Sequence, residues 1–239
     1  MENNLRANEF SASGLSATAA MRQVLVTGGT GYLGRAAIPK LIERGHRVRA
    51  LVRAGSERKL ASGCEAVIGD ALDARSIAAA LAGCDTLVQL VGTPKPAPWK
   101  AESFRAIDER SCLAALEAAR EQSARGGPSV HFVYLSVAQP APVMKAYTAV
   151  RARCEAAIRA SGLDATFLRP WYVIGPGHRW PIVLAPIYGL LGALPATHAS
   201  AERLALVALD DLVEALVHAV ETPITGVKVI DAPAMRSRR

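Results

Sequence analysis

TGGTGYLG, residues 27–34, carries three glycines at the spacing GxxGxxG: Gly28, Gly31 and Gly34. Glycines at this spacing permit a tight turn, close approach of the backbone to a pyrophosphate, and close packing of a helix on a strand. A glycine triplet alone is also typical of a flexible turn, so its setting matters. Here an apolar, β-branched run precedes it and a helical pattern follows it, which is the setting that a dinucleotide-binding loop needs.

Outward from this loop, strand-like and helix-like segments alternate as far as Pro170. The apolar runs that predict strands are 22–28, 46–53, 65–70, 85–92, 129–136 and 164–170. The amphipathic segments that predict helices are 33–44, 73–83, 102–122 and 147–160, with Asp73 as the expected cap of the second. Because the strands are apolar throughout, we expect a parallel sheet with helices on both faces. The pattern predicts an α/β, Rossmann-type doubly wound fold.

The pattern changes after Pro170. Residues 171–200 are rich in proline, glycine and aromatic residues. A short strand, a helix and a further strand are then predicted at 203–207, 210–221 and 226–231. We expect residues 171–232 to contribute a small C-terminal lobe on the substrate side, with Asp210 or Asp211 capping its helix.

Residues 21–235 are predicted to form one domain that includes this lobe. Residues 1–20 are polar and small, lack the apolar core of a signal peptide, and are expected to be a disordered extension. Residues 236–239 form a basic tail. The stretch 181–197 is the most apolar of the chain, but its prolines and its length argue against a spanning helix. Peripheral contact with a membrane through this stretch is kept as an alternative.

The composition narrows the class of partner. The formal charge of +7 comes from scattered basic residues, with one cluster in the terminal RSRR and few aromatic residues among them. We therefore expect no nucleic-acid binding, since attraction for an anionic cofactor or substrate explains the charge equally well. The four cysteines lie far apart, so we expect no metal site, no disulfide framework, and a reducing, cytoplasmic location. A monomer and a homodimer are both compatible with the sequence.

The end of the second predicted strand indicates which dinucleotide is bound. A site for NAD(H) usually places an acidic residue there, to bind the 2′-hydroxyl of the ribose. This chain has Arg53 instead, followed by Ser56, Arg58 and Lys59. An arginine can pair with a 2′-phosphate, so the sequence favours NADP(H) over NAD(H). Arg35 is a possible second contact, and a solvated basic turn is the alternative interpretation.

Further cofactor contacts are expected at the same edge of the sheet. Asp70 follows the third strand and is placed to accept a hydrogen bond from the adenine amino group, with Ala71 beside it. Gly92 closes the fourth strand and would let the backbone run close to a ribose. An ordinary loop aspartate is the alternative for position 70. The cofactor contacts expected in the glycine loop and after the fourth strand are Gly28, Thr30, Gly31, Tyr32, Leu33, Gly34, Leu90, Val91 and Gly92.

The helix predicted at 147–160 begins with a chemically suggestive pair. Tyr147 and Arg151 stand four residues apart and therefore share one helix face. Ser136 ends the apolar run that precedes this helix. We expect the phenol and the permanent cation to point together into a cleft. An amphipathic surface helix without a role in a site is the alternative.

Taken together, these motifs make the chain resemble the short-chain dehydrogenase/reductase superfamily, in its extended and atypical branches. The residues that carry the resemblance are TGGTGYLG, the GD pair at 69–70, Ser136, Tyr147 with a base four residues on, and LRPWYVIGPG at 168–177. It covers roughly residues 22–232. The chain looks most similar to atypical NAD(P)-binding proteins grouped with NmrA-like redox sensors and the complex I accessory subunit.

The resemblance implies a role for each matching residue. Ser136 would hold a substrate carbonyl, and Tyr147 would give or take its proton. A lysine would stand at position 151 in that family, to hold the nicotinamide ribose and acidify the tyrosine. Arg151 keeps the positive charge, but it effectively never deprotonates and cannot relay a proton as a lysine can.

The segment that begins at Pro170 would border the nicotinamide and the substrate, through Trp171 and Val173. Two functions stay open at this point. One is an NADP(H)-dependent carbonyl reductase, or a sugar-type epimerase or dehydratase, that uses Tyr147. The other is a redox sensor or assembly protein that binds the cofactor without turnover, with Arg151 only clamping the ribose.

Overall fold

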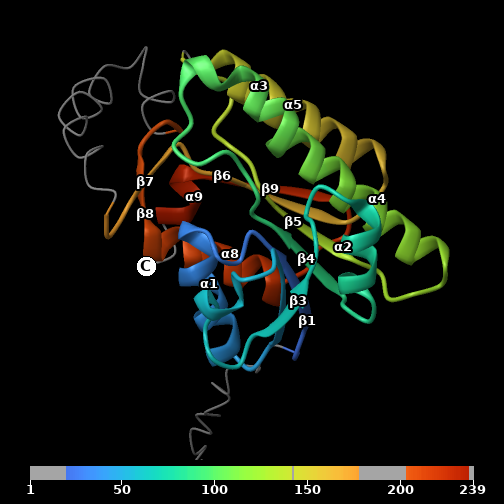
Figure 1. Ribbon diagram of the computed structural model, residues 1–239. Coiled ribbons are helices and arrows are strands. Elements are labelled where there is room, and N and C mark those ends of the chain that lie inside the picture. Colours follow the sequence, from blue (N-terminus) through green and yellow to red (C-terminus); the bar gives the residue numbers. More distant parts are fainter. Residues whose placement is uncertain (1–19, 142, 178–202, 237–239) are drawn as a thin grey trace, which may run out of the picture.

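The structure is a computed structural model that describes residues 20–141, 143–177 and 203–236 (Figure 1). The predictions for the extension at 1–19, for the apolar stretch at 181–197 and for residues 237–239 lie outside the described residues. Within the described part, no helix is long and apolar enough to cross a membrane. The same part holds no group of three or more side chains suited to bind a metal ion.

Seven parallel strands form one sheet, in the order β3-β2-β1-β4-β5-β6-β9. The strands are β1 (Gln23–Thr27), β2 (Arg47–Val52), β3 (Glu65–Ile68), β4 (Thr86–Gln89), β5 (His131–Leu135), β6 (Ala165–Arg169) and β9 (Val227–Asp231). Strand β1 pairs with β2 on one side and with β4 on the other, so the direction of winding reverses there. In such sheets, ligands bind outside the carboxyl ends of the strands at this reversal point.

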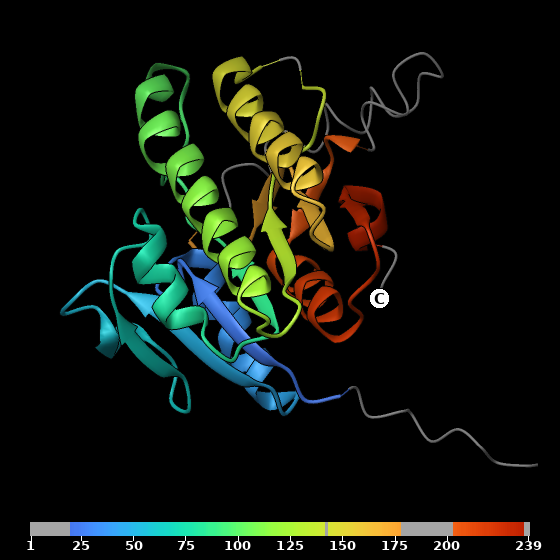
Figure 2. The same cartoon turned by 90° about the vertical axis from the view of Figure 1, so that its right-hand side faces the viewer.

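Helices cover both faces of the sheet (Figures 1 and 2). Helices α1 (Tyr32–Glu43) and α8 (Leu209–Glu221) pack together on one face, while α2 (Ala74–Leu81), α4 (Arg110–Ala124) and α5 (Lys145–Ala160) cover the other. The remaining helical segments are short: η1 (Glu57–Lys59), η2 (Pro98–Lys100), α3 (Ala101–Ser103), η3 (Phe104–Glu109) and α9 (Ala232–Arg236). The predicted doubly wound α/β fold is confirmed.

The alternation of side chains in the central strands explains the two layers. Val24 and Val26 of β1 pack toward α1 and α8, and Leu25 between them packs toward α2 and α4. The expected cover by helices on both faces does not extend to the whole of β3, where Ile68 is 54% exposed. That strand lies at the edge of the sheet and has a neighbour on one side.

The C-terminal region differs from its prediction in two respects. Helix α8 and strand β9 belong to the main layers, and the separate part is a two-stranded sheet of β7 (Tyr172–Ile174) and β8 (Leu206–Ala208). The predicted cap of α8 is also wrong, because the residue before the helix is Ala208. Asp210 and Asp211 lie in the first turn instead, where a negative charge favours the positive end of the helix dipole.

The predicted helix at 102–122 is present, but it is not a regular α-helix. Residues Phe104–Glu109 form a π-helical segment between α3 and α4. Such wider turns are frequent at functional sites. The predicted cap of α2 is confirmed, since the Asp73 carboxylate accepts hydrogen bonds from the backbone N–H groups of Arg75 and Ser76.

Candidate functional site

The glycine loop joins β1 to α1 and lies against the end of β4. Gly28 has a φ of +75°, and a Cβ atom there would lie 2.9 Å from the carbonyl carbon of Leu90. A Cβ on Gly34 would lie 2.6 Å from the carbonyl oxygen of Gly28 and from the Cα of Gly29. Glycine is therefore required at these two positions by the close packing of loop, helix and neighbouring strand.

The start of α1 fits an anionic group. Gly31 precedes the helix, no side chain caps its first turn, and no acidic residue lies in that turn. Gly31 is exposed, and Thr30 and Tyr32 are half-buried, whereas Leu33 is buried in the core. Unpaired N–H groups at a helix N-terminus together with the helix dipole bind phosphates well. These residues can accept the pyrophosphate of a dinucleotide.

Basic residues lie beyond the carboxyl end of β2. Arg53 is exposed, and its carbonyl oxygen accepts a hydrogen bond of 3.0 Å from the N–H of Ser56. That turn leads into η1, where Arg58 and Lys59 are exposed as well. Arg35, in the first turns of α1, is also exposed.

Asp70 and Ala71 follow β3. The Asp70 side chain is exposed, and one of its carboxylate oxygens accepts a hydrogen bond of 2.9 Å from the N–H of Leu72. The carboxylate thus stabilises its own turn. Ala71 is half-buried beside it. A contact of Asp70 with adenine stays a prediction.

The chain after β4 passes the glycine loop and then turns toward α5. The N–H of Leu90 donates to the carbonyl oxygen of Thr27, and Val91 lies beside Gly28. A Cβ on Gly92 would lie 2.5 Å from Nη2 of Arg151. The absence of a side chain at Gly92 therefore leaves room for the guanidinium of Arg151. The predicted contact of Gly92 with a ribose stays a prediction.

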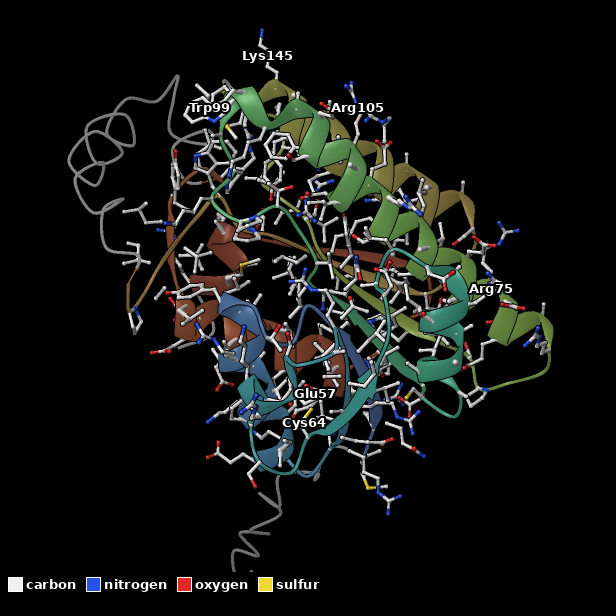
Figure 3. All side chains as sticks on the ribbon, in the orientation of Figure 1. Glu57, Cys64, Arg75, Trp99, Arg105 and Lys145 are labelled. Carbon is white, nitrogen blue, oxygen red and sulfur yellow. The ribbon has the colours of Figure 1, made fainter. Side chains whose placement is uncertain are left out.

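Arg151 is buried, with 3% of its surface exposed. Its Nη2 forms an ion pair of 2.6 Å with Oδ1 of Asp108, and its Nη1 donates to the carbonyl oxygen of Leu135 at 2.8 Å and to the Tyr134 hydroxyl at 3.2 Å. The expectation that this cation points into an open cleft is therefore wrong. Lys145, at the start of α5, is exposed and points outward (Figure 3).

The groups around Arg151 keep its guanidinium protonated. Burial alone would lower the pKa of the Arg151 guanidinium, but the net shift is well upward because two phenols and a carboxylate surround it. They belong to Tyr147, Tyr134 and Asp108. The side chain is therefore a permanent cation that is held by the protein itself.

Tyr147 is half-buried in the first turn of α5. Its ring centroid lies 5.0 Å from that of Phe104 and 5.2 Å from Cζ of Arg151. The ring is therefore held between an aromatic side chain and a buried guanidinium, while part of the residue reaches solvent. This is a suitable arrangement for a phenol that exchanges a proton with a ligand.

Ser136 is 3% exposed and donates its hydroxyl proton to Oε1 of Glu155 at 2.5 Å. Glu155 is itself buried, and Arg169 pairs with it through Nε at 2.9 Å. Gln139 donates to the same carboxylate at 3.1 Å. The structure thus links Ser136 to a buried polar network between β5, α5 and β6.

The segment after β6 begins with Pro170, which is buried. Trp171 and Tyr172 are half-buried, with ring centroids 5.5 Å apart. Val173 packs against the core on the α8 side. Their contact with a nicotinamide stays a prediction.

The sequence profile of an NAD(P)H-binding family matches residues 28–179. The chain belongs to this family. It is thereby a member of the extended and atypical short-chain dehydrogenase/reductase superfamily, as its motifs predict. The narrower likeness to NmrA-like redox sensors stays a prediction.

Two similar proteins are reductases by name. The ceramide reductase of Caulobacter vibrioides is 29% identical over 212 residues, which are 88% of this chain and 64% of that protein. The 3-diazoavenalumate denitrifying reductase of a Streptomyces species is 30% identical over 228 residues, with 85% of this chain and 74% of that protein covered. The chain thus spans less than two thirds of the length of the ceramide reductase.

The fold of this NAD(P)H-binding protein is also found in solved structures. The enzyme WbmH of Bordetella bronchiseptica, in complex with NAD+, matches with a TM-score of 0.65 and 20% identity, over 89% of this chain and 76% of that one. At this level of identity the likeness concerns the fold alone.

The local sequence pattern does not indicate three buried polar residues of this NAD(P)H-binding protein: Asp108, Glu155, and Thr93, whose N–H and hydroxyl both donate to Asp108. Helical spacing is the only signal for Glu155, which stands four residues after Arg151 on the face shared with Tyr147. Asp108 lies within a predicted amphipathic helix, where an aspartate is expected to face solvent. The residues around Asp108 in the sequence do not indicate that its side chain is buried.

Proposed function

We propose that the protein binds NADP(H) and reduces a carbonyl group, with Tyr147 as the proton donor. The observation that carries this proposal is the half-buried Tyr147, whose ring lies 5.2 Å from Cζ of Arg151, the arginine that packs against Gly92 in the segment beside the glycine loop. The names of the two similar reductases support reduction over sugar epimerisation.

The proposed cofactor contacts lie along the carboxyl edge of the sheet. The backbone N–H groups at Gly31 would hold the pyrophosphate, and Arg53 would pair with the 2′-phosphate. Asp70 and Ala71 would contact the adenine. The ribose would lie along Leu90–Gly92, and the nicotinamide would lie near Pro170, Trp171 and Val173. When bound, the nicotinamide supplies or accepts a hydride.

The proton comes from the protein. Tyr147 would donate its phenolic proton to the carbonyl oxygen of the substrate, which then becomes an alcohol. We assign Arg151 to the support of this tyrosine and not to the ribose, because its guanidinium is buried and bound to Asp108 and to Leu135.

A second candidate is a protein that binds NADP(H) without turnover. The state of Ser136 favours it, since the hydroxyl is buried and donates its single proton to Glu155. A serine in this state does not offer that proton to a carbonyl.

Fluorescence titration with NADPH and NADH, followed by NADPH oxidation with a panel of ketones and aldehydes, tests the proposal. The panel includes long-chain ketones because of the ceramide reductase likeness. We expect tighter binding of NADPH than of NADH, and turnover that Tyr147→Phe abolishes without loss of binding. Tight NADPH binding without oxidation of NADPH across the panel would favour the second candidate. Equal or tighter binding of NADH would contradict the NADP(H) assignment.

A further inference from the structure

Asp108 is a fully buried carboxylate behind the candidate site. Its Oδ1 accepts a hydrogen bond of 2.6 Å from Nη2 of Arg151. Its Oδ2 accepts from the backbone N–H of Thr93 at 2.8 Å and from the Thr93 hydroxyl at 2.6 Å. Both oxygens are used, so one carboxylate joins helix α5 to the segment that leaves β4 beside the glycine loop.

The ion pair of Arg151 and Asp108 packs against Gly92, in the segment that follows β4. Nη2 of Arg151 lies against Gly92, where a Cβ atom would approach it to 2.5 Å, and Oδ1 of Asp108 lies 3.1 Å from the same point. Two buried charges are tolerated only when geometry and additional hydrogen bonds compensate for the lost solvation. Here Leu135 and Thr93 supply those additional bonds.

Segments η3 and α5 contact each other through two pairs of residues with the same spacing. Phe104 and Asp108 stand four residues apart in η3, and Tyr147 and Arg151 stand four residues apart in α5. Phe104 contacts Tyr147, and Asp108 contacts Arg151. Asp108 is therefore connected to Tyr147 through the arginine.

The groups that can carry charge around this pair come from four elements. They are Asp108 of η3, Tyr134 of β5, Cys112 of α4, and Tyr147 and Cys154 of α5. Burial raises the pKa of the Tyr134 hydroxyl well above its usual value, and the pKa of the Cys112 thiol is raised by its contact with Cys154 and by burial. The hydrogen bond with Cys112 lowers the pKa of the Cys154 thiol. Asp108 is the group of this cluster that forms an ion pair with the guanidinium, at 2.6 Å.

A cation 5.2 Å from a phenol ring favours the phenolate, as opposite charges at such distances do. A carboxylate at 2.6 Å from the same guanidinium offsets that influence. We propose that Asp108 is the positioning residue of this site: it fixes Arg151 and the Thr93 segment, and it offsets the charge of the guanidinium behind the Tyr147 ring, so that Arg151 acts on the phenol less strongly than an unpaired cation would. This inference rests on the proposed function, in which Tyr147 must be a proton donor.

Ultraviolet titration of the phenol at 295 nm tests this without turnover. The difference between the protein and its Tyr147→Phe variant isolates the signal of one tyrosine. In Asp108→Asn, Arg151 is left as an unbalanced cation, and we expect the midpoint of the difference titration to move to lower pH by about one unit. Glu109→Gln, which removes the neighbouring carboxylate that pairs with Arg153 on the surface, is the matched control and should leave the midpoint in place.

An unchanged midpoint in folded Asp108→Asn would overturn the proposal. If that variant does not fold, the double variant Asp108→Asn/Arg151→Met carries no charge in the cluster and takes its place. Its midpoint should then match that of the unaltered protein. A rise of one unit or more would show that Arg151 already acts on Tyr147 without being cancelled, and would also overturn the proposal. Failure to find a carbonyl substrate would contradict the proposed function and leave this titration valid.

Discussion

Gly34 is the position of the loop that least tolerates a side chain, because three backbone atoms would lie very close to a Cβ atom there. A Cβ there meets Gly28 O, Gly29 Cα and Gly29 O at 2.6 Å each. Replacing a helical glycine by alanine gains up to about 1 kcal/mol of helix propensity, but forced overpacking costs about 1–3 kcal/mol. We expect Gly34→Ala to lower the free energy of unfolding, measured by urea denaturation.

Gly31→Ala is the matched control for this prediction. Its φ of −76° suits alanine, and its Cβ would meet a single atom, Gly28 O, at 3.1 Å. We expect nearly unchanged stability but weaker NADPH binding, because the new methyl group would stand at the exposed start of α1. Equal loss of stability in Gly31→Ala and Gly34→Ala would contradict the packing argument.

Arg53 carries the choice between the two dinucleotides. It is exposed at the carboxyl end of β2, and a charged hydrogen bond to a phosphate contributes about 1.5–3 kcal/mol. Arg53→Glu should therefore weaken NADPH binding by at least about tenfold and affect NADH binding much less, as measured by fluorescence titration. Arg47→Glu makes the same change at the amino end of the same strand, and it should alter neither affinity.

At the scale of the element, α5 is tied to η3 by two ion pairs of different burial. Arg153 pairs with Glu109 at 2.6 Å, but its side chain is 52% exposed, whereas Arg151 and Asp108 are buried. Exposed pairs contribute about 0–1 kcal/mol, and breaking a buried pair costs about 3–5 kcal/mol. We expect Arg153→Ala to change the free energy of unfolding little and Arg151→Met to lower it strongly.

The double variant Asp108→Asn/Arg151→Met completes this comparison in urea denaturation. It should be more stable than Arg151→Met alone, because the lone buried carboxylate is gone. A double variant as unstable as the sum of its parts would show that the two residues act independently.

The same element shows what the sequence could and could not predict. The spacing of Tyr147 and Arg151 correctly places both on the inner face of α5, since one face of a helix repeats every three or four residues. Which of them is exposed depends on Asp108, forty-three positions earlier in the chain. A partner at that distance leaves no trace in a local pattern, and neither does the π-helical turn that contains it.

At the scale of the whole molecule, the alternation of strands and helices was sufficient to predict the doubly wound sheet. The order of the strands in the sheet was not predicted, and it explains why β3 and β9 differ from their predictions. β3 reads as a buried strand but lies at the edge, where Ile68 reaches solvent. β9 reads as part of a separate lobe but pairs with β6 in the main sheet. Apolar content alone does not distinguish an edge strand from a central one.

The closed core also makes the protein sensitive to acid. His131 of β5 is 3% exposed and shares a hydrogen bond of 3.1 Å with the Thr166 hydroxyl. Burial, with the nearby charge of Arg22, lowers the pKa of His131 to about 4, against about 6.5 in an unfolded chain. Burial lowers the pKa of His46 as well. The unfolded state therefore takes up protons first as the pH falls.

The stability that neutral His131 provides is complete above about pH 6.5, and it is lost as the pH falls from there toward 4. One such group changes the free energy of unfolding by up to about 1.4 kcal/mol per pH unit in this window. His131→Gln retains a side chain that can hydrogen-bond to Thr166 but does not titrate, so urea denaturation should show a shallower pH dependence between pH 6.5 and 4.5. Between pH 7 and 8 the two proteins should respond in parallel. An identical slope in the acid window would mean that His131 takes up its proton in the folded state and that the core opens to admit it.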